Sequence, residues 1–343
     1  MTAAVPAFLI LLLAQDKPLV QFADDPAVRW NDPVWSADGK RVAFRVTKDD
    51  RQHIVVDGRA DEPCDGAHHQ PRLSPDGSSL AYVATRGMKN VIVRDGKVVE
   101  EADQIEHVQW TPDGKLARAL RSGERWTLVV GDARTELAGG PNEVVFAGKN
   151  AGWIIGGMVT VNGRSEPLDS AMHLTFGPDG TPAHVASKSG VVFIIAGGRK
   201  VMDRGDVAHP AVGPGGKLAF HQRAGREWAL IVDGREVARD STLGVPVWSP
   251  DGSGVACGGR RHMFAGAATH GPHDAVAHPT WSPDGKRFAY AALAEGAWHV
   301  VVGDRKIGPF KRVGPPVFAG GKLAFGTVTV ADGKVSIAWK TVD

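Results

Sequence analysis

The sequence predicts an all-β fold assembled from tandem copies of one short antiparallel sheet. Three observations predict it. A turn motif of the Trp-Ser-Pro-Asp-Gly type recurs at intervals of 30 to 38 residues, an alternating apolar strand follows each copy, and a hairpin dipeptide ends the next strand. Short four-stranded sheets repeated at this interval are typical of the blades of a β-propeller. The sequence therefore predicts a single β-propeller.

Each copy of the turn motif begins at an apolar residue, called the anchor below. In Ser-Pro-Asp-Gly, proline sets φ at the second turn position and glycine suits the fourth, which is the chemistry of a type I turn. The clear copies begin at Trp35, Leu73, Trp110, Phe176, Val212, Trp248 and Trp281, and two degenerate copies begin at Phe146 and Phe318. Nine anchors predict about nine blades, or eight if the short repeat at Phe146 is not a blade.

Two strands follow each anchor with the two-residue period of β-structure. Alanine recurs between the alternating apolar residues of the first of them, at Ala43, Ala81, Ala219, Ala289 and Ala324. A small residue there lets neighbouring sheets approach closely. The next strand is β-branched and ends in a hairpin dipeptide such as Asp57-Gly58 or Asn162-Gly163, which accepts the positive φ of a tight turn. A short polar fourth strand completes the unit.

The last repeat stops after its third strand, at residues 340–343. Residues 18–22, Pro-Leu-Val-Gln-Phe, precede the first anchor and have no repeat of their own to pair with. We expect this segment to supply the outer strand of the last blade and so to close the ring.

The first 14 residues, MTAAVPAFLILLLA, form an apolar run that is too short to span a bilayer and has the size of a signal-peptide core. We predict a signal peptide over residues 1–14, cleavage near Ala14, and a periplasmic or secreted protein. The alternative is an apolar N-terminus that packs on the domain. No second apolar segment is long enough to cross a membrane, and residues 15–343 are predicted to form one propeller domain.

Charge and cysteine content exclude some classes of protein. Forty basic residues face 38 acidic ones, so no basic excess favours a nucleic-acid ligand. Cys64 and Cys257 lie in different repeats and do not form a Cys-x-x-Cys pair, so we interpret both as small core residues. A long-range disulfide between them is the alternative.

The anchors followed by strands of the type Lys-Arg-Phe-Ala-Tyr, as at Lys286–Tyr290, resemble the repeats of TolB-type propellers, which are relatives of the WD-repeat propellers. The resemblance covers the chain from about Asp32 onward. It implies the fold, but such repeats occur in periplasmic scaffold proteins, in prolyl-oligopeptidase-like enzymes and in some polysaccharide lyases. The peptidases carry a hydrolase domain with a Gly-x-Ser-x-Gly elbow, and this sequence has no such elbow.

One aligned position carries the candidate site. Three residues before the anchors, at the expected start of the innermost strand, stand Asp32, Gln70, His107, Glu143, His173, His209, Val245, His278 and Pro315. Imidazole, amide and carboxylate groups that converge at one mouth of the channel could hold a divalent transition metal. Some lyases with this propeller type hold a metal through His and Gln at such a mouth. The resulting metal hypothesis comprises His107, His173, His209, His278, Gln70 and Glu143, and the alternative is a polar lining of the channel.

Two further features have ordinary interpretations beside functional ones. Arg260-Arg261-His262 with His270 and His273 could bind an anion or form a solvated loop. Trp126, Trp228 and Trp298 recur before the third strand, and we interpret them as core between blades rather than as a ligand platform.

The sequence contains no Walker loop, His-Glu-x-x-His or EF-hand motif, so an enzyme is the less favoured class. We expect an exported, non-catalytic propeller without a cofactor that binds a protein partner in the cell envelope, alone or as part of a larger assembly. The alternative is a metal-dependent enzyme, or a propeller that binds a small molecule or saccharide at the histidine-rich channel mouth.

Overall fold

The computed structural model describes residues 18–62, 64–202 and 205–343. The predicted signal peptide, residues 1–14, lies outside the described residues. The chain forms two compact units. The first comprises the residues up to Ala138 with Pro309–Gly314 and Ala319–Asp343, and the second comprises Gly139–Gly308 with Pro315–Phe318.

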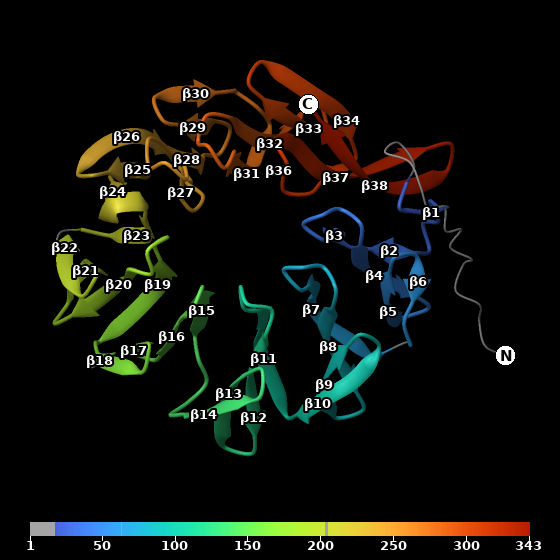
Figure 1. Ribbon diagram of the computed structural model, residues 1–343, viewed down its shortest axis with the longest axis horizontal. Coiled ribbons are helices and arrows are strands. Elements are labelled where there is room, and N and C mark those ends of the chain that lie inside the picture. The colour runs from blue at the N-terminus through green and yellow to red at the C-terminus, as the bar shows by residue number, and fades with distance from the viewer. Residues whose placement is uncertain (1–17, 63, 203–204) are drawn as a thin grey trace. The chain divides into compact units, whose positions relative to one another are not determined.

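The described residues form nine antiparallel sheets (Figure 1), and all but the last are up-and-down meanders of strands that follow one another along the chain. This confirms the predicted all-β class and the nine-bladed β-propeller. Blades one to three, in the first unit, are formed by β2 (Arg29–Trp30), β3 (Val34–Trp35), β4 (Val42–Lys48), β5 (Arg51–Val56), β6 (Arg59–Ala60); β7 (Gly66–Leu73), β8 (Leu80–Arg86), β9 (Lys89–Arg94), β10 (Lys97–Ala102); β11 (Gln104–Trp110), β12 (Leu116–Ser122), β13 (Arg125–Val130) and β14 (Ala133–Leu137).

Blades four to eight lie in the second unit, except for the last two residues of β34. They are formed by β15 (Glu143–Ala147), β16 (Asn150–Ile155), β17 (Met158–Val161), β18 (Arg164–Pro167); β19 (Ser170–Phe176), β20 (Pro182–Lys188), β21 (Val191–Ala196), β22 (Arg199–Met202); β23 (Val207–Val212), β24 (Leu218–Ala224), β25 (Glu227–Val232), β26 (Arg235–Asp240); β27 (Val247–Trp248), β28 (Val255–Gly258), β29 (Met263–Ala265), β30 (Ala268–His270); β31 (Ala275–Trp281), β32 (Phe288–Ala294), β33 (Ala297–Val302) and β34 (Arg305–Phe310). The degenerate repeat at Phe146 is a full blade of four strands, which removes the eight-blade alternative.

The ninth blade joins the two ends of the described chain. Its strands are β35 (Arg312–Val313), β36 (Val317–Ala319), β37 (Lys322–Ala331), β38 (Lys334–Val342) and β1 (Val20–Ala23). Val20 pairs with Ile337 and Phe22 with Val335, so the N-terminal segment supplies the outer strand of the last blade as predicted. Phe22 is buried and stacks on Phe44 of the first blade, with ring centroids 5.8 Å apart.

No helix in residues 18–62, 64–202 and 205–343 has the length and hydropathy needed to cross a bilayer. The helical structure assigned there is a single 3-10 turn, η1 (Pro214–Gly216).

Within each unit, hydrophobic core lies between successive blades, where each sheet buries one face against its neighbour. Between the ninth and first blades, for example, Phe44 and Val46 pack with Val328 and Ile337. The five alanines predicted to allow close approach are all buried, and Cys64 and Cys257 are buried free thiols. This confirms the interpretation of both cysteines as core residues.

The hydroxyl residue after the anchor determines the turn. Ser74 Oγ donates a hydrogen bond of 2.5 Å to Asp76 Oδ1, which also accepts from the Ser78 backbone N–H at 3.0 Å. The hydrogen bond from Ser74 lowers the pKa of Asp76 to about 2. The same hydroxyl-to-carboxylate hydrogen bond joins Ser36 to Asp38, Thr111 to Asp113, Ser249 to Asp251, and Ser282 to Asp284.

Anchor side chains link consecutive blades. The indole Nε1 of Trp248 donates to the Ala211 carbonyl of the preceding blade at 2.9 Å, and Trp110 donates to the Arg72 carbonyl at the same distance. The Trp248 ring also lies where a side chain at Gly213 would be, 2.4 Å from the position of an added Cβ. Glycine is therefore required at position 213 for the seventh blade to pack on the sixth.

Candidate functional site

The four histidines of the predicted site share one backbone feature. His107, His173, His209 and His278 all have positive φ, between 48° and 57°. Each lies where the inner strand of its blade gains one residue over its partner strand, for example between Glu106 and Gln109 of β11. Each of these histidines is therefore part of a β-bulge.

The bulge supplies a physical reason for the recurrence of histidine. Among residues other than glycine, Asn, Asp and His adopt the left-handed region several times more often than the rest. Histidine at this position therefore satisfies a backbone requirement whether or not its ring binds a ligand. The bulge also changes the direction of the side chain, which is a common use of bulges beside binding sites.

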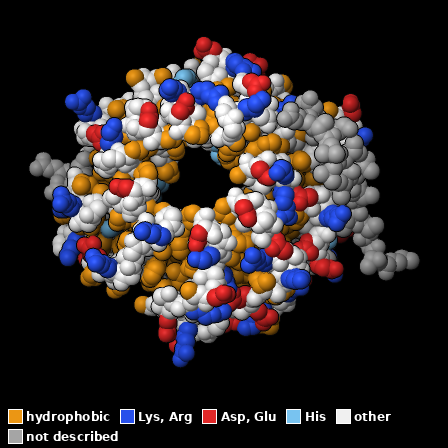
Figure 2. Space-filling model, viewed as in Figure 1, with side chains coloured by type: hydrophobic (Ala, Val, Ile, Leu, Met, Phe, Trp, Pro, Cys, Tyr) orange, Lys and Arg blue, Asp and Glu red, His pale blue; other side chains and the backbone are white. Residues whose placement is uncertain are grey.

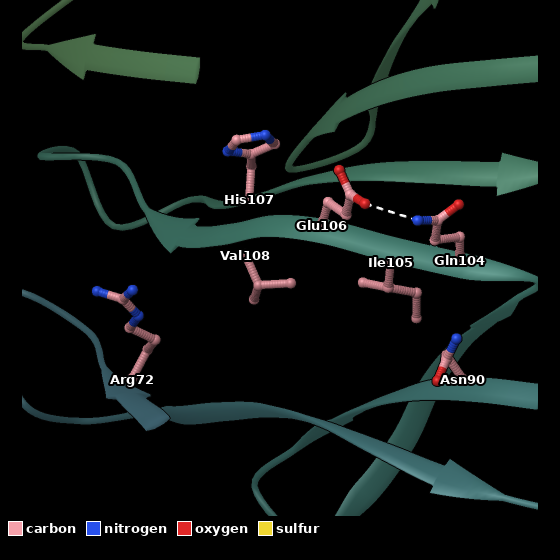
Figure 3. Close-up of a pocket in the computed structure, with 7 residues that line it drawn as sticks. All are labelled: Arg72, Asn90, Gln104, Ile105, Glu106, His107 and Val108. Carbon is pink, nitrogen blue, oxygen red and sulfur yellow. Dashed lines mark hydrogen bonds between the residues drawn. The ribbon is translucent and has the colours of Figure 1, made fainter. Parts of the chain in front are cut away.

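In the third blade the bulge places His107 at a cavity of about 520 Å³ in the first unit. Figure 3 shows Glu106 and His107, which are consecutive residues, projecting to the same side of β11, whereas Ile105 and Val108 project toward Arg72 and Asn90 of the second blade. Glu106 Oε1 accepts a hydrogen bond of 2.7 Å from Gln104 Nε2. The cavity thus has an imidazole and a carboxylate of one strand at one side and apolar side chains facing the second blade.

Gln70 and His278 lie at the corresponding positions of the second and eighth blades. Gln70 is exposed and lies on β7 within an irregularity of the β7–β8 register. His278 lies in the β31 bulge and is followed by Pro279, which has no N–H, so this bulge has one backbone donor fewer than the bulge of the fifth blade. Gln70 and His107 belong to the first unit, whereas His278 belongs to the second.

Glu143 holds the bulge of the blade that follows it. Its Oε1 accepts a hydrogen bond from the His173 backbone N–H, and its Oε2 accepts one from the Leu174 N–H, both at 2.7 Å. The two amides belong to bulge residues, which the β20 ladder leaves unpaired. The Glu143 carboxylate therefore has a structural role between the fourth and fifth blades.

Three histidines of the second unit form a row that leads from the bulges into the interior. The ring centroids of His173 and His209 are 4.0 Å apart, and those of His209 and His221 are 5.4 Å apart. His221 is buried, and its Nε2 lies 3.7 Å from the Cys257 Sγ. The Cys257 thiol donates to the Gly244 carbonyl at 2.9 Å. Sequence analysis placed His173 and His209 in the site and missed His221.

Burial sets the charge of this row. It lowers the pKa of His173 and of His209, and it lowers the pKa of His221 to about 4, with a smaller contribution from its histidine neighbours. Burial also raises the pKa of the Cys257 thiol. At neutral pH the row consists of neutral imidazoles beside a neutral thiol. His173 and His209 line a cavity of about 400 Å³ between the fifth and sixth blades.

A second hollow of the second unit, here called the anchor groove, has a volume of about 700 Å³. It is lined by residues 147–150, 175–180, 211–212 and 246–248, which come from four consecutive blades. Phe176, Val212 and Trp248 give it an apolar lining, and Lys149 and Asp179 give it charges of both signs. Val212 lies against Gly177 just as Trp248 lies against Gly213.

Sequence analysis missed the anchor groove, although a signal was present. Three of the four repeats that contribute to it are consecutive and have Ala or Gly in place of the hydroxyl residue after the anchor, namely those anchored at Phe146, Phe176 and Val212. The groove therefore coincides with the stretch that departs most from the repeat motif.

The predicted metal ligands are distributed over both units. In the parts of the chain that the structure describes, no three His, Cys, Asp or Glu side chains are grouped so as to hold a metal ion. The assignment of a metal to His107, His173, His209, His278, Gln70 and Glu143 stays a prediction.

The basic and histidine-rich cluster of the seventh blade packs on the eighth blade. Arg261 Nε donates to the His273 carbonyl at 2.9 Å, and His273 Nε2 lies 3.1 Å from the Tyr290 hydroxyl. The His270 ring lies 5.7 Å from the Tyr290 ring. Two of its histidines thus belong to the packing between these blades. On the face drawn in Figure 2, Lys and Arg side chains are interspersed with Asp and Glu side chains, in keeping with a formal net charge of +2.

Comparison with known proteins gives structures of the same fold class at low identity. The chain is similar to the Dos1 propeller (TM-score 0.48, 10% identity, 94% of each chain covered) and to an oligogalacturonate lyase in complex with manganese (TM-score 0.42, 12% identity, 99% of each chain covered). It is also similar to TolB from Acinetobacter baumannii (TM-score 0.29, 20% identity, covering 62% of this chain and 53% of TolB). No family model matches the sequence, and no curated protein matches it.

Proposed function

We propose that this protein is an exported, non-catalytic propeller of the TolB type that binds a partner protein in the cell envelope through the anchor groove. The observation that carries the proposal is the composition of that groove. Four consecutive blades contribute to it, its lining includes Phe176 and Trp248, and its charged groups, Lys149 and Asp179, have opposite signs. Aromatic residues in a partly desolvated hollow with a polar surround are the usual centre of a protein interface.

The rigidity of the groove supports the same function. Trp248 is fixed by its hydrogen bond to the Ala211 carbonyl and by its contact with Gly213, and Val212 is fixed against Gly177. Groups held in place before binding lose little conformational entropy when a partner docks. The chemistry of the groove suits a loop of the partner that carries an apolar residue between polar ones.

Site-specific photo-crosslinking in the native host tests the proposal. A photoreactive residue is placed at Pro178, which is exposed in the groove, and in a second variant at Pro112, which is exposed at the equivalent turn position of the third blade. We expect one discrete envelope protein to be captured from position 178 and not from position 112. We also expect Pro178→Arg to abolish this capture from a reporter at Lys149, while Pro112→Arg leaves it unchanged.

Equal capture from both positions, or capture that Pro178→Arg does not reduce, would contradict the groove as the binding site. Cell fractionation tests the export part separately. Recovery of the protein with residues 1–14 intact in the cytosol contradicts it, whatever the crosslinking shows.

A second candidate function is the binding of a small molecule or saccharide, or metal-dependent chemistry, at the His107 cavity. The observation that favours it is the bulge, which directs Glu106 and His107 to the same side of β11 (Figure 3). Elemental analysis of the purified protein, with His107→Asn and His278→Asn as matched variants, tests the metal. A stoichiometric metal that only His107→Asn removes supports it, and a metal content below stoichiometry in the unmodified protein contradicts it.

A further inference from the structure

The cavity between the fifth and sixth blades has an apolar wall. Met172, Val185, Val192, Val207 and Trp228 contribute to it, and its volume of about 400 Å³ is within the range of small-molecule sites. Trp228 belongs to the set of tryptophans that we interpreted as core between blades. It is half-buried, and the Arg223 guanidinium lies 5.2 Å from its ring centroid, which restricts the orientation of the indole.

Five side chains among the described lining residues give the same cavity a polar part, and two of them, Ser170 and Ser187, form a hydrogen bond of 2.8 Å with each other. His173 and His209 line it, and in the described residues their ring nitrogens have no hydrogen-bond partner. Asp206 lines it as well and is the one charged side chain among the lining residues that the structure describes. Because burial keeps both imidazoles neutral, each ring offers one donor and one acceptor.

These properties restrict the chemistry of a ligand. An anion would meet Asp206 without a basic side chain among the described lining residues to pair with it. A saccharide would place hydroxyl groups against the apolar wall, where unpaired polar groups cost free energy. A flat ring satisfies the wall and Trp228 through its faces, and ring nitrogens at its edge satisfy the imidazoles and the carboxylate.

We propose that this cavity binds a planar, weakly basic heteroaromatic small molecule. The cavity shares no described lining residue with the anchor groove, although β19 and β23 contribute to both. A propeller with both features would bind a partner at one place and sense a small molecule at another.

Titration calorimetry with benzimidazole as the probe tests the proposal. Cyclohexylamine, which is basic but not planar, and glucose are the chemical controls. We expect benzimidazole to bind with a Kd of about 1 mM or tighter, as suits a ligand of its size, and both controls to bind at least tenfold more weakly.

Matched variants assign the binding to the cavity. His209→Asn removes the imidazole and keeps a residue that tolerates positive φ, and His278→Asn makes the same change in the bulge of the eighth blade. We expect His209→Asn to weaken binding at least tenfold and His278→Asn to leave it within twofold. Val192→Trp, which fills the cavity, should abolish binding, whereas Val191→Trp on the exposed side of the same strand should not.

Several results would overturn the proposal. These are no heat of binding up to the solubility limit of benzimidazole, equal affinity for cyclohexylamine or glucose, and equal effects of His209→Asn and His278→Asn. Circular dichroism of each variant shows whether a loss of binding reflects a loss of fold. If Val192→Trp does not fold, the comparison of His209→Asn with His278→Asn still tests the proposal.

Discussion

Arg118 of β12 and Glu100 of β10 form an ion pair between the third and second blades, with both side chains about nine-tenths buried. Arg118 Nε donates to Glu100 Oε2 at 2.7 Å, and its Nη1 donates to the Leu116 and Gly131 carbonyls. Arg118 follows the buried alanine position of its blade. Most blades have an aromatic residue there, namely Phe44, Tyr82, Phe220, Tyr290 and Phe325. The third blade therefore replaces an aromatic contact between blades with a charged one.

Removing one partner of this pair should destabilise the protein strongly. Glu100→Ala leaves the Arg118 guanidinium buried without its carboxylate, which costs about 3–5 kcal/mol. Glu236→Ala breaks the exposed pair of Glu236 with Arg239 and should cost less than about 1 kcal/mol. Urea unfolding of both variants measures the difference. Similar losses in the two variants would mean that Arg118 is solvated and not buried.

His184 occupies the same aromatic position in the fifth blade, and His184→Phe should stabilise the protein. Both ring nitrogens of His184 are buried without a hydrogen-bond partner, and burial lowers its pKa. Phenylalanine removes these two polar atoms from the core, for a gain of about 1–3 kcal/mol. The increase in the urea midpoint measures it. The matched change Tyr82→Phe removes a hydroxyl that donates to Asp61 and should not stabilise.

Stability should fall on acidification because of His221. Its pKa is about 4 in the folded chain and 6.5 without burial, so the unfolded chain takes up a proton at higher pH than the folded chain does. The contribution of neutral His221 is present above pH 6.5 and is lost as the pH falls toward 4, by at most about 1.4 kcal/mol per pH unit. Urea midpoints between pH 7.5 and 4.5 measure this slope. A slope in His221→Met as steep as in the unmodified protein would exclude His221 as its source.

The bulge should tolerate residues in the order of their preference for positive φ. His278→Asn should change stability little, whereas His278→Val should cost about 1–3 kcal/mol, because a β-branched residue is strained at φ of 55°. Thermal unfolding of the two variants tests this order. If histidine is instead present at position 278 because its ring binds a ligand, His278→Asn and His278→Val should impair function equally. The two variants should then also have the same stability.

Phe22→Ala should weaken the ninth blade selectively. Phe22 is buried against Phe44, so its truncation costs about 3–5 kcal/mol. We expect amide hydrogen exchange to rise most along β37 and β38, which pair with each other and, through β38, with β1. An increase of the same size in the fifth and sixth blades would contradict a local role.

The nine anchors predicted the blades because each turn motif is a local property. Proline, aspartate and glycine determine the turn within a few residues, and the strands on either side follow. Residues 18–22 could be placed in the last blade because the ninth repeat lacked a strand and this segment was available to fill it. No long-range geometry was needed for either inference.

The meaning of the recurring histidine could not be read without the backbone. His107, His173, His209 and His278 line up in the sequence as ligands would, and the structure places each in a bulge. The sequence did contain a signal for the bulge. This signal is the proline that stands two residues before six of the anchors, as at Pro210 and Pro279. The contacts of Glu143 with two amides of the next blade and the packing of Val212 on Gly177 depend on distances between blades, which repeat spacing does not contain.

The pairing of β1 with β38 has a consequence for the order of assembly. Every other blade consists of strands that follow one another along the chain, so it can form as soon as its own stretch has been synthesised. The ninth blade must wait until residues as far apart as Gln21 and Ser336, separated by 315 positions, are both available. Until then the apolar side chains of Val20 and Phe22 have no sheet to enter, and this early segment needs protection from aggregation.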